Sequence, residues 1–189
     1  MNKHITDGSV ATSMICQTMP IAMPTALIDA PCSHTLVLGL GNTLLSDEGA
    51  GVYVVRTLAA HSADFPGVQW MDGGTLGFAL ADAVVQAHAL IVVDTANLEA
   101  PAGTVRVFED AAMDEFVSTG KKSSVHEVSL NDLLAVALLE DRLPRRRALV
   151  GIQPLSLDWG EQPSAAVQAG MLQAAEAVKH ILQRWQHVP

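Results

Sequence analysis

The chain has few cysteines, and the two that it has lie outside the predicted core. Cys16 and Cys32 both fall in a first segment that shows no periodic pattern. They provide no disulfide framework, no thiolate metal site and no nucleophile inside the fold. Cysteine chemistry is therefore excluded from the candidate functions.

Long hydrophobic runs are also absent. No apolar stretch approaches the roughly 18–20 residues that are needed to cross a bilayer. The N-terminal segment is broken by Pro20 and Pro24 and lacks the compact apolar block of a secretory signal. These absences predict a soluble cytoplasmic protein with no membrane partner.

Basic residues are scarce. The sequence has 11 Lys and Arg residues against 20 Asp and Glu residues, which gives a net charge of −9. A chain this acidic gains nothing from counterion release and is repelled by phosphate backbones. Nucleic acid is therefore not expected as a partner.

Several catalytic and binding motifs are missing. The sequence contains no G-x-S-x-G elbow and no H-E-x-x-H helix. Gly39 and Gly41 begin a dinucleotide-binding motif, but its third glycine position is Leu44. The acidic pair Asp47 and Glu48 before the next helix would also repel a pyrophosphate. Nucleotide binding is not expected.

The clearest pattern runs from Leu36 to Gly51, LVLGLGNTLLSDEGAG. Its apolar start is typical of a strand buried on both faces of a parallel sheet. Asp47 and Glu48 follow after a short loop, and a helix is predicted to begin at Gly49. In open parallel sheets the chemistry lies outside the carboxyl ends of the strands, so this acidic pair is the first candidate site.

The remaining segments predict one α/β domain over residues 34–189. We expect three α/β/α layers and a five-stranded mixed sheet of order 2-1-3-5-4, of the phosphorylase/hydrolase-like kind. The fourth strand should be antiparallel because the loop 95–103 is too short for a crossover helix. Residues 1–33 are predicted to be a poorly ordered N-terminal extension. The predicted strands are 36–39, 68–72, 89–94, 104–109 and 148–152, and the predicted helices are 49–61, 76–86, 126–138 and 167–185, with 145–147 as a solvated loop.

Three further polar residues are predicted to lie at the same edge as Glu48. Asp72 and Asp94 end the second and third strands, and His126 opens the helix before the last strand. Each acid has an ordinary structural role: Asp47 can cap a helix, Asp72 precedes a Gly-Gly turn, and Asp94 can bond to loop amides. Together, however, the acids would repel one another without a cation. A Glu, an Asp and a His from separate segments suit a hard-to-borderline metal.

With these residues assembled, the sequence resembles the endopeptidases that mature the large subunits of nickel-iron hydrogenases. The resemblance covers residue 35 to about 185. Its main departure from the family pattern is the long N-terminal extension. Five blocks carry it in order and spacing, namely VLGLGNTLLSDEGAGV, DGGTLG, IVVDTA, HEVSLNDLL and LVGIQPLSLDWG.

The resemblance implies an unusual aspartyl-type endopeptidase. Such proteins cut a short C-terminal extension from the large-subunit precursor after nickel is installed, and the substrate-borne nickel is the recognition element. The metal-contacting positions correspond to Glu48, Asp94 and His126, and Asp72 matches the aspartate of the DGGT block. The free enzyme need not hold a metal and is a monomer by default. Either Asp72 or Asp47 could act as the base.

Two alternatives stay open at this point. Peptidyl-tRNA hydrolase also opens with a G-L-G-N turn, but here no proline follows Asn42, and the acidic charge opposes tRNA. A non-catalytic, metal-responsive binding module would use the same three ligands and take up nickel without cleaving any precursor. For the endopeptidase, specificity is expected in the surface loops, and the segments 95–103, 110–125 and 153–163 are predicted to contact the precursor.

Overall fold

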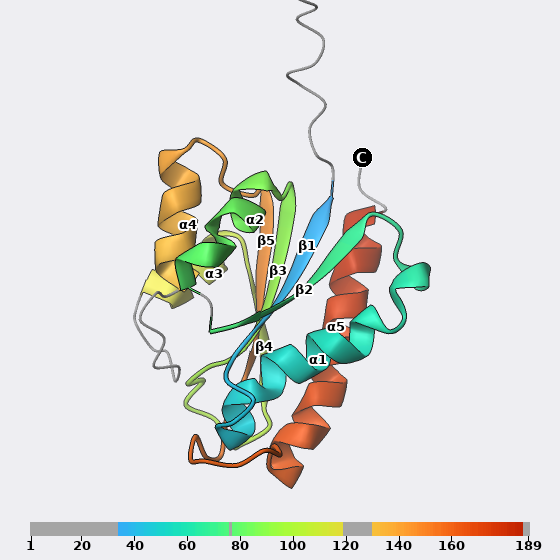
Figure 1. Cartoon of the computed structure of the whole chain (residues 1–189), viewed down its shortest axis with the longest axis vertical. Coiled ribbons are helices and arrows are strands. Elements are labelled where there is room, and N and C mark those ends of the chain that lie inside the picture. Colours follow the sequence, from blue (N-terminus) through green and yellow to red (C-terminus); the bar gives the residue numbers. More distant parts are fainter. Residues whose placement is uncertain (1–33, 76, 119–129, 187–189) are drawn as a thin grey trace, which may run out of the picture. The chain divides into compact units, whose positions relative to one another are not determined.

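The computed structural model describes residues 34–75, 77–118 and 130–186. Within them, a five-stranded sheet has helices on both of its faces (Figure 1). The predicted N-terminal extension over residues 1–33 and the predicted metal ligand His126 lie outside the described residues. Both stay predictions.

The sheet has the order β2-β1-β3-β5-β4, as predicted. β1 pairs in parallel with β2 and β3, and β3 pairs in parallel with β5, whereas β4 runs antiparallel to β5. The short connection between β3 and β4 turns the chain straight back, which accounts for the single antiparallel strand. The strands are Thr35–Leu40 (β1), Val68–Gly74 (β2), Ala89–Thr95 (β3), Val105–Glu109 (β4) and Arg146–Ile152 (β5).

The helices form two layers. α1 and α5 pack on one face of the sheet, and α2, α3 and α4 pack on the other (Figure 1). The helices are Ala50–Ala59 (α1), Ala81–Gln86 (α2), Ala111–Ser118 (α3), Leu130–Leu139 (α4) and Ala165–Gln186 (α5), with 3-10 turns at Ser46–Gly49 (η2), Ser62–Asp64 (η3) and Gly77–Leu80 (η4). Among the described helices, none combines the length and the apolar character that crossing a membrane requires.

The central strand β3 explains why its sequence is continuously apolar. Ile91 and Val93 pack into the core beneath α1 and α5, whereas Leu90 and Val92 pack into the core beneath α2, α3 and α4. All four side chains are 0% exposed. A strand that is covered by helices on both faces needs an apolar residue at every position.

Two local predictions were wrong. The segment after β4, which the sequence predicts as part of the surface loop 110–125, forms helix α3. This helix packs into the core through Met113 and Val117, which lie one helical turn apart. The predicted loop 145–147 is partly strand, because β5 begins at Arg146. Neither difference moves the carboxyl edge of the sheet, where the candidate site lies.

Candidate active site

The carboxyl ends of the parallel strands lie level with one another. Gly39 of β1 is in register with Asp72 of β2 on one side and with Val93 of β3 on the other. Asp94 of β3 is in register with Gly151 of β5. The residues that follow these positions therefore emerge along one edge of the sheet.

Close backbone packing brings the segment after β1 to this edge. A Cβ atom on Gly51 would overlap the carbonyl oxygens of both Val93 and Leu40. A Cβ atom on Gly41, whose φ is +130°, would overlap the carbonyl oxygen of Glu48. Glycine is the residue that fits such positions, because any side chain would push the segments apart. Turn η2, which carries Asp47 and Glu48, consequently contacts β3.

Glu48 is the least satisfied side chain of the edge. It is 0% exposed, and neither Oε1 nor Oε2 has a hydrogen-bond partner among the described residues. Buried polar atoms in native proteins are nearly always paired, so an unpaired buried carboxylate calls for an explanation. A ligand that arrives from outside the chain is one such explanation.

Asp94 lies at the end of β3, the strand that η2 contacts. Its side chain is 7% exposed, and its Oδ1 accepts a hydrogen bond of 2.8 Å from the backbone N–H of Thr95. This bond fixes the carboxylate at the strand terminus, and its donor belongs to the last residue of β3 and not to the loop that follows. Two acids from separate segments, Glu48 and Asp94, are therefore held inside one edge of the sheet.

The sequence predicts that Asp47 can cap α1, but the structure shows that it does not. Gly49 occupies the N-cap position, and no side chain caps that helix. The carboxylate of Asp47 is 0% exposed and turns instead toward the loop that leads into α5. Its Oδ2 accepts hydrogen bonds from the backbone N–H of Leu155 (2.8 Å), the N–H of Ser156 (3.0 Å) and the hydroxyl of Ser164 (3.0 Å), and its Oδ1 accepts one from the N–H of Ser164 (2.5 Å).

The loop between β5 and α5 is fastened to the segment after β1 at further points. Leu45 and Gly160 form an isolated parallel β-bridge, in which the N–H of Ser46 donates to Gly160 at 2.6 Å. The hydroxyl of Tyr53 donates to the carbonyl of Glu161 at 3.0 Å. Sequence reasoning missed these partners because they lie more than 100 residues apart along the chain. The local signal for Ser164 is its place directly before α5, a position that favours serine.

Asp72 lies at the same edge but is separated from Asp94. Two strand spacings, about 9.5 Å, lie between the backbones of Asp72 and Val93. The Oδ2 of Asp72 accepts a hydrogen bond from Nε of Arg56 on α1 (2.8 Å) and forms an ion pair with Nη2 of the same arginine (2.7 Å). Its Oδ1 accepts a hydrogen bond from the N–H of Gly74 (3.1 Å). The bond to Gly74 lies at the end of β2, which includes both glycines, and the arginine partner had no sequence signal.

The predicted third metal contact, His126, is not among the residues that the structure describes. Within residues 34–75, 77–118 and 130–186, no group of three or more His, Cys, Asp or Glu side chains is placed to hold a metal ion. The described part of the site is therefore a pair of buried acids, Glu48 and Asp94. Their assignment as metal contacts stays a prediction.

Comparison with known proteins decides the family. The HycI hydrogenase maturation protease family matches residues 52–183 of this chain. The chain belongs to this family. It is 34% identical over 155 residues to the hydrogenase expression/formation protein HoxM of Cupriavidus necator, with 82% of this chain and 76% of that protein covered. It is 32% identical to the hydrogenase 2 maturation protease of Escherichia coli, with 76% of this chain and 87% of that protein covered.

The fold of this hydrogenase maturation protease agrees with the sequence match. Its structure is similar to that of the hydrogenase maturating endopeptidase HybD from Escherichia coli, with a TM-score of 0.71 and 29% sequence identity. The match covers 80% of this chain and 93% of that chain. Membership of the family makes the chain a peptidase, which confirms the predicted enzyme class over the peptidyl-tRNA hydrolase and binding-module alternatives.

Proposed function

We propose that this protein removes the C-terminal extension from the large-subunit precursor of a nickel-iron hydrogenase after nickel insertion. The observation that carries the proposal is Glu48, whose carboxylate is fully buried with no hydrogen-bond partner among the described residues. A cation that arrives with the precursor would provide the missing partner. Family membership also supports a role in hydrogenase processing, because the relatives are hydrogenase maturation proteases.

The energetics of Glu48 favour a site that is completed by its substrate. An unsatisfied buried charge costs more than about 3 kcal/mol of folding free energy. A neutral hydrogen-bond donor would offset part of this cost, and a divalent cation would offset more of it through direct electrostatic attraction. An acid kept in this state is therefore poised to bind a cation strongly when one is delivered.

In the proposed reaction, Glu48, Asp94 and His126 contact the nickel of the precursor. Two carboxylates and one imidazole leave coordination positions open for ligands from the substrate. The contacts fix the precursor so that the scissile carbonyl is polarised, or a water is activated, at that ion. Attack of water on the carbonyl carbon, with proton transfer to the leaving amine, then gives two peptide products.

The two base candidates differ in their surroundings. Asp47 is fully buried, and both of its oxygens already accept hydrogen bonds from loop donors. Asp72 is partly exposed and is held by Arg56. Of the two, Asp72 is better placed to receive a proton, because a general base must reach the water that it activates.

The remaining features of the proposal follow from charge and composition. A net charge of −9 fits a protein substrate better than a nucleic acid. We place the reaction in the cytoplasm and take the monomer as the working state. Nickel is treated as part of the substrate and not as a resident cofactor.

Single replacements at the three proposed contacts test the function. Glu48→Gln, Asp94→Asn and His126→Ala should each give a folded protein that no longer shortens a nickel-loaded precursor, measured as mass loss at the precursor C-terminus. Glu140→Gln, at an exposed position beyond α4, is the matched control and should process normally. Normal cleavage by all three variants would overturn the proposal. Binding of nickel by the wild type without any cleavage of the nickel-loaded precursor would overturn it as well.

A further inference from the structure

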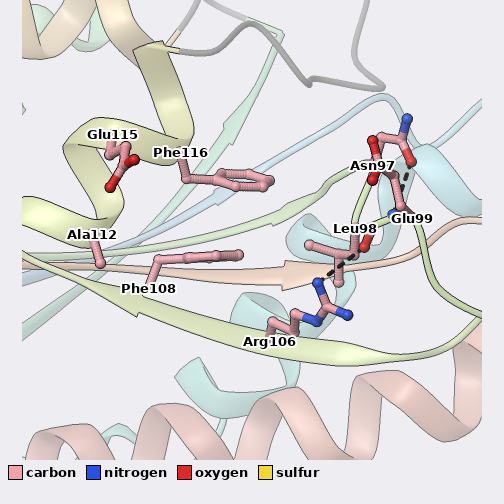
Figure 2. Close-up of a pocket in the computed structure, with 8 residues that line it drawn as sticks. All are labelled: Asn97, Leu98, Glu99, Arg106, Phe108, Ala112, Glu115 and Phe116. Carbon is pink, nitrogen blue, oxygen red and sulfur yellow. Dashed lines mark hydrogen bonds between the residues drawn. The ribbon is translucent and has the colours of Figure 1, made fainter.

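A cavity of about 350 Å³ lies on the face of the sheet that α3 covers (Figure 2). Its walls come from three segments, namely the loop after β3, strand β4 and helix α3. The volume is at the small end for ligand sites and suits one or two amino-acid side chains. The lining residues are Asn97, Leu98, Glu99, Arg106, Phe108, Ala112, Glu115 and Phe116.

The loop that lines one wall of the cavity directly follows β3, the strand that carries the proposed metal contact Asp94. Its first lining residue, Asn97, follows Asp94 by three positions. The loop between them is held in place, since the N–H of Leu98 donates to Oε1 of Gln153 at 2.7 Å and the N–H of Ala96 donates to the carbonyl of Ile152 at 2.9 Å. A peptide that is anchored at Asp94 therefore reaches the cavity within a few residues.

Part of the cavity wall is aromatic, and part of it carries a hydrogen-bond donor. Phe108 and Phe116 stack with their ring centroids 4.1 Å apart and their planes 18° apart, and both rings remain partly exposed (Figure 2). Arg106 lies beside them, and its Nη1 donates to the carbonyl of Leu98 at 3.0 Å. A guanidinium has five N–H donors, so donors remain for a ligand. This combination suits an apolar side chain together with a main-chain carbonyl.

The neighbouring strand offers a backbone edge as well. β4 is the last strand of the described sheet and pairs with β5 alone. The carbonyl of Thr104 accepts the N–H of Gln153, directly after β5, and the N–H of Asp110 donates to the carbonyl of Arg147 in β5. The alternate residues Val105, Val107 and Glu109 therefore direct their peptide groups away from β5. An exposed strand edge accepts an extended peptide by main-chain pairing, and alternate side chains of that peptide then lie over one face.

We propose that this cavity is a specificity pocket that binds an apolar side chain of the precursor peptide, close to the bond that is cut. The side chain packs on the Phe108–Phe116 pair, and Arg106 donates to the carbonyl of the same peptide. The lining includes described residues of two segments, 95–103 and 110–125, for which the sequence predicted contact with the precursor. This inference rests on the proposed endopeptidase function and adds the chemistry of the residue that is recognised.

Filling the pocket from one exposed position tests the proposal. Ala112 lines the cavity and is exposed, so Ala112→Trp places a large ring in the pocket without altering the core. Ala111→Trp is the matched control, because Ala111 is also exposed on α3 but does not line the cavity. With nickel-loaded precursor, Ala112→Trp should raise KM at least tenfold and leave kcat within twofold, whereas Ala111→Trp should change neither by more than twofold.

A panel of precursors identifies the bound side chain and covers the case of a poorly folded variant. Apolar residues on either side of the cut are replaced singly by alanine and tested with the wild type, Ala112→Leu and Ala112→Trp. The replacement that removes the side chain bound in the pocket should raise KM for the wild type. The same replacement should raise KM less for Ala112→Leu and Ala112→Trp, because their pockets no longer bind that side chain. Equal KM values for the Ala112 and Ala111 variants, or additive effects at every precursor position, would overturn the pocket. A wild type that processes no precursor would instead overturn the proposed function.

Discussion

The carboxylate of Asp47 accepts hydrogen bonds from both the backbone N–H and the hydroxyl of Ser164, which lies 117 residues further along the chain. The same carboxylate accepts the N–H groups of Leu155 and Ser156. One buried side chain therefore fixes the loop after β5 against the turn that holds Glu48. This loop carries Leu155 and Trp159, which are 68% and 81% exposed. The hydrogen bonds to Asp47 therefore hold a loop with two exposed apolar side chains in a fixed position.

Removing the Asp47 carboxylate should destabilise the protein. Asp47→Ala leaves three N–H groups and one hydroxyl without their acceptor, and we expect a loss of about 4 kcal/mol in the free energy of unfolding. Urea denaturation measures this loss. Hydrogen exchange should also accelerate at the amides of Leu155, Ser156 and Ser164. Asp82→Ala is the control, because exposed Asp82 accepts one bond from Gln86 within α2, and it should cost less than about 0.5 kcal/mol.

A purely chemical role for Asp47 makes the opposite prediction. If Asp47 were only the proton acceptor, Asp47→Asn would abolish processing and leave both stability and amide exchange unchanged. We expect instead that stability and processing fall together in Asp47→Asn, since the loop and the neighbouring Glu48 lose their common support.

For Glu48, we expect a replacement that abolishes activity to leave stability unchanged or raise it. Because its buried oxygens have no partner among the described residues, replacing the charge with the neutral amide of Glu48→Gln removes a desolvation cost. We expect an unfolding midpoint equal to or above that of the wild type, together with loss of processing. Thermal denaturation and the processing assay check the two parts. A marked drop in the midpoint would show that the carboxylate has a structural partner.

Asp72 and Arg56 can be separated by their variants. Their ion pair is 36% and 57% exposed, so Arg56→Gln should cost less than about 1 kcal/mol of stability. If Asp72 is the base, Asp72→Asn lowers kcat by about 100-fold, while Arg56→Gln, which keeps the carboxylate, changes kcat less than threefold. An equal loss of kcat in both variants would show that the pair only holds the turn.

Arg147 and Asp114 form the ion pair that we expect to contribute most to stability away from the site. The side chain of Arg147 is 13% exposed, and its hydrogen bonds to Asp114 raise the pKa of the guanidinium above its usual value. The arginine thus stays charged, and Asp114→Asn leaves that charge poorly compensated, at a cost of about 2 kcal/mol in urea denaturation. Glu109→Gln, which breaks the more exposed pair with Arg184, is the control and should cost less than about 1 kcal/mol.

Much of the fold could be predicted because its signals are local. The continuous apolar runs of β1 and β3 indicate strands covered on both faces, and the short β3–β4 connection fixes the direction of β4. Helix α3 was missed because it is one short amphipathic segment within polar surroundings, with Met113 and Val117 as its only buried side chains. Arg147 was placed in a loop because a charged residue in a strand depends on a partner, Asp114, that its neighbours in sequence do not reveal.

The site was predictable in its location and less so in its contacts. The acids that end strands had to meet at the carboxyl edge, which follows from parallel topology alone. Asp47 faces the loop before α5, while Glu48 is buried with no partner among the described residues. This difference depends on the direction of each side chain within a 3-10 turn. Adjacent residues there point in different directions, and sequence spacing alone does not assign them.

The most direct measurement compares two forms of one large-subunit precursor, with and without nickel, incubated separately with the full-length protein. Mass spectrometry of the precursor C-terminus reports the cut. Loss of the extension in the nickel-loaded form alone is the expected result, since the ion completes the contacts begun by Glu48 and Asp94. Equal cleavage of both forms would contradict recognition through the metal.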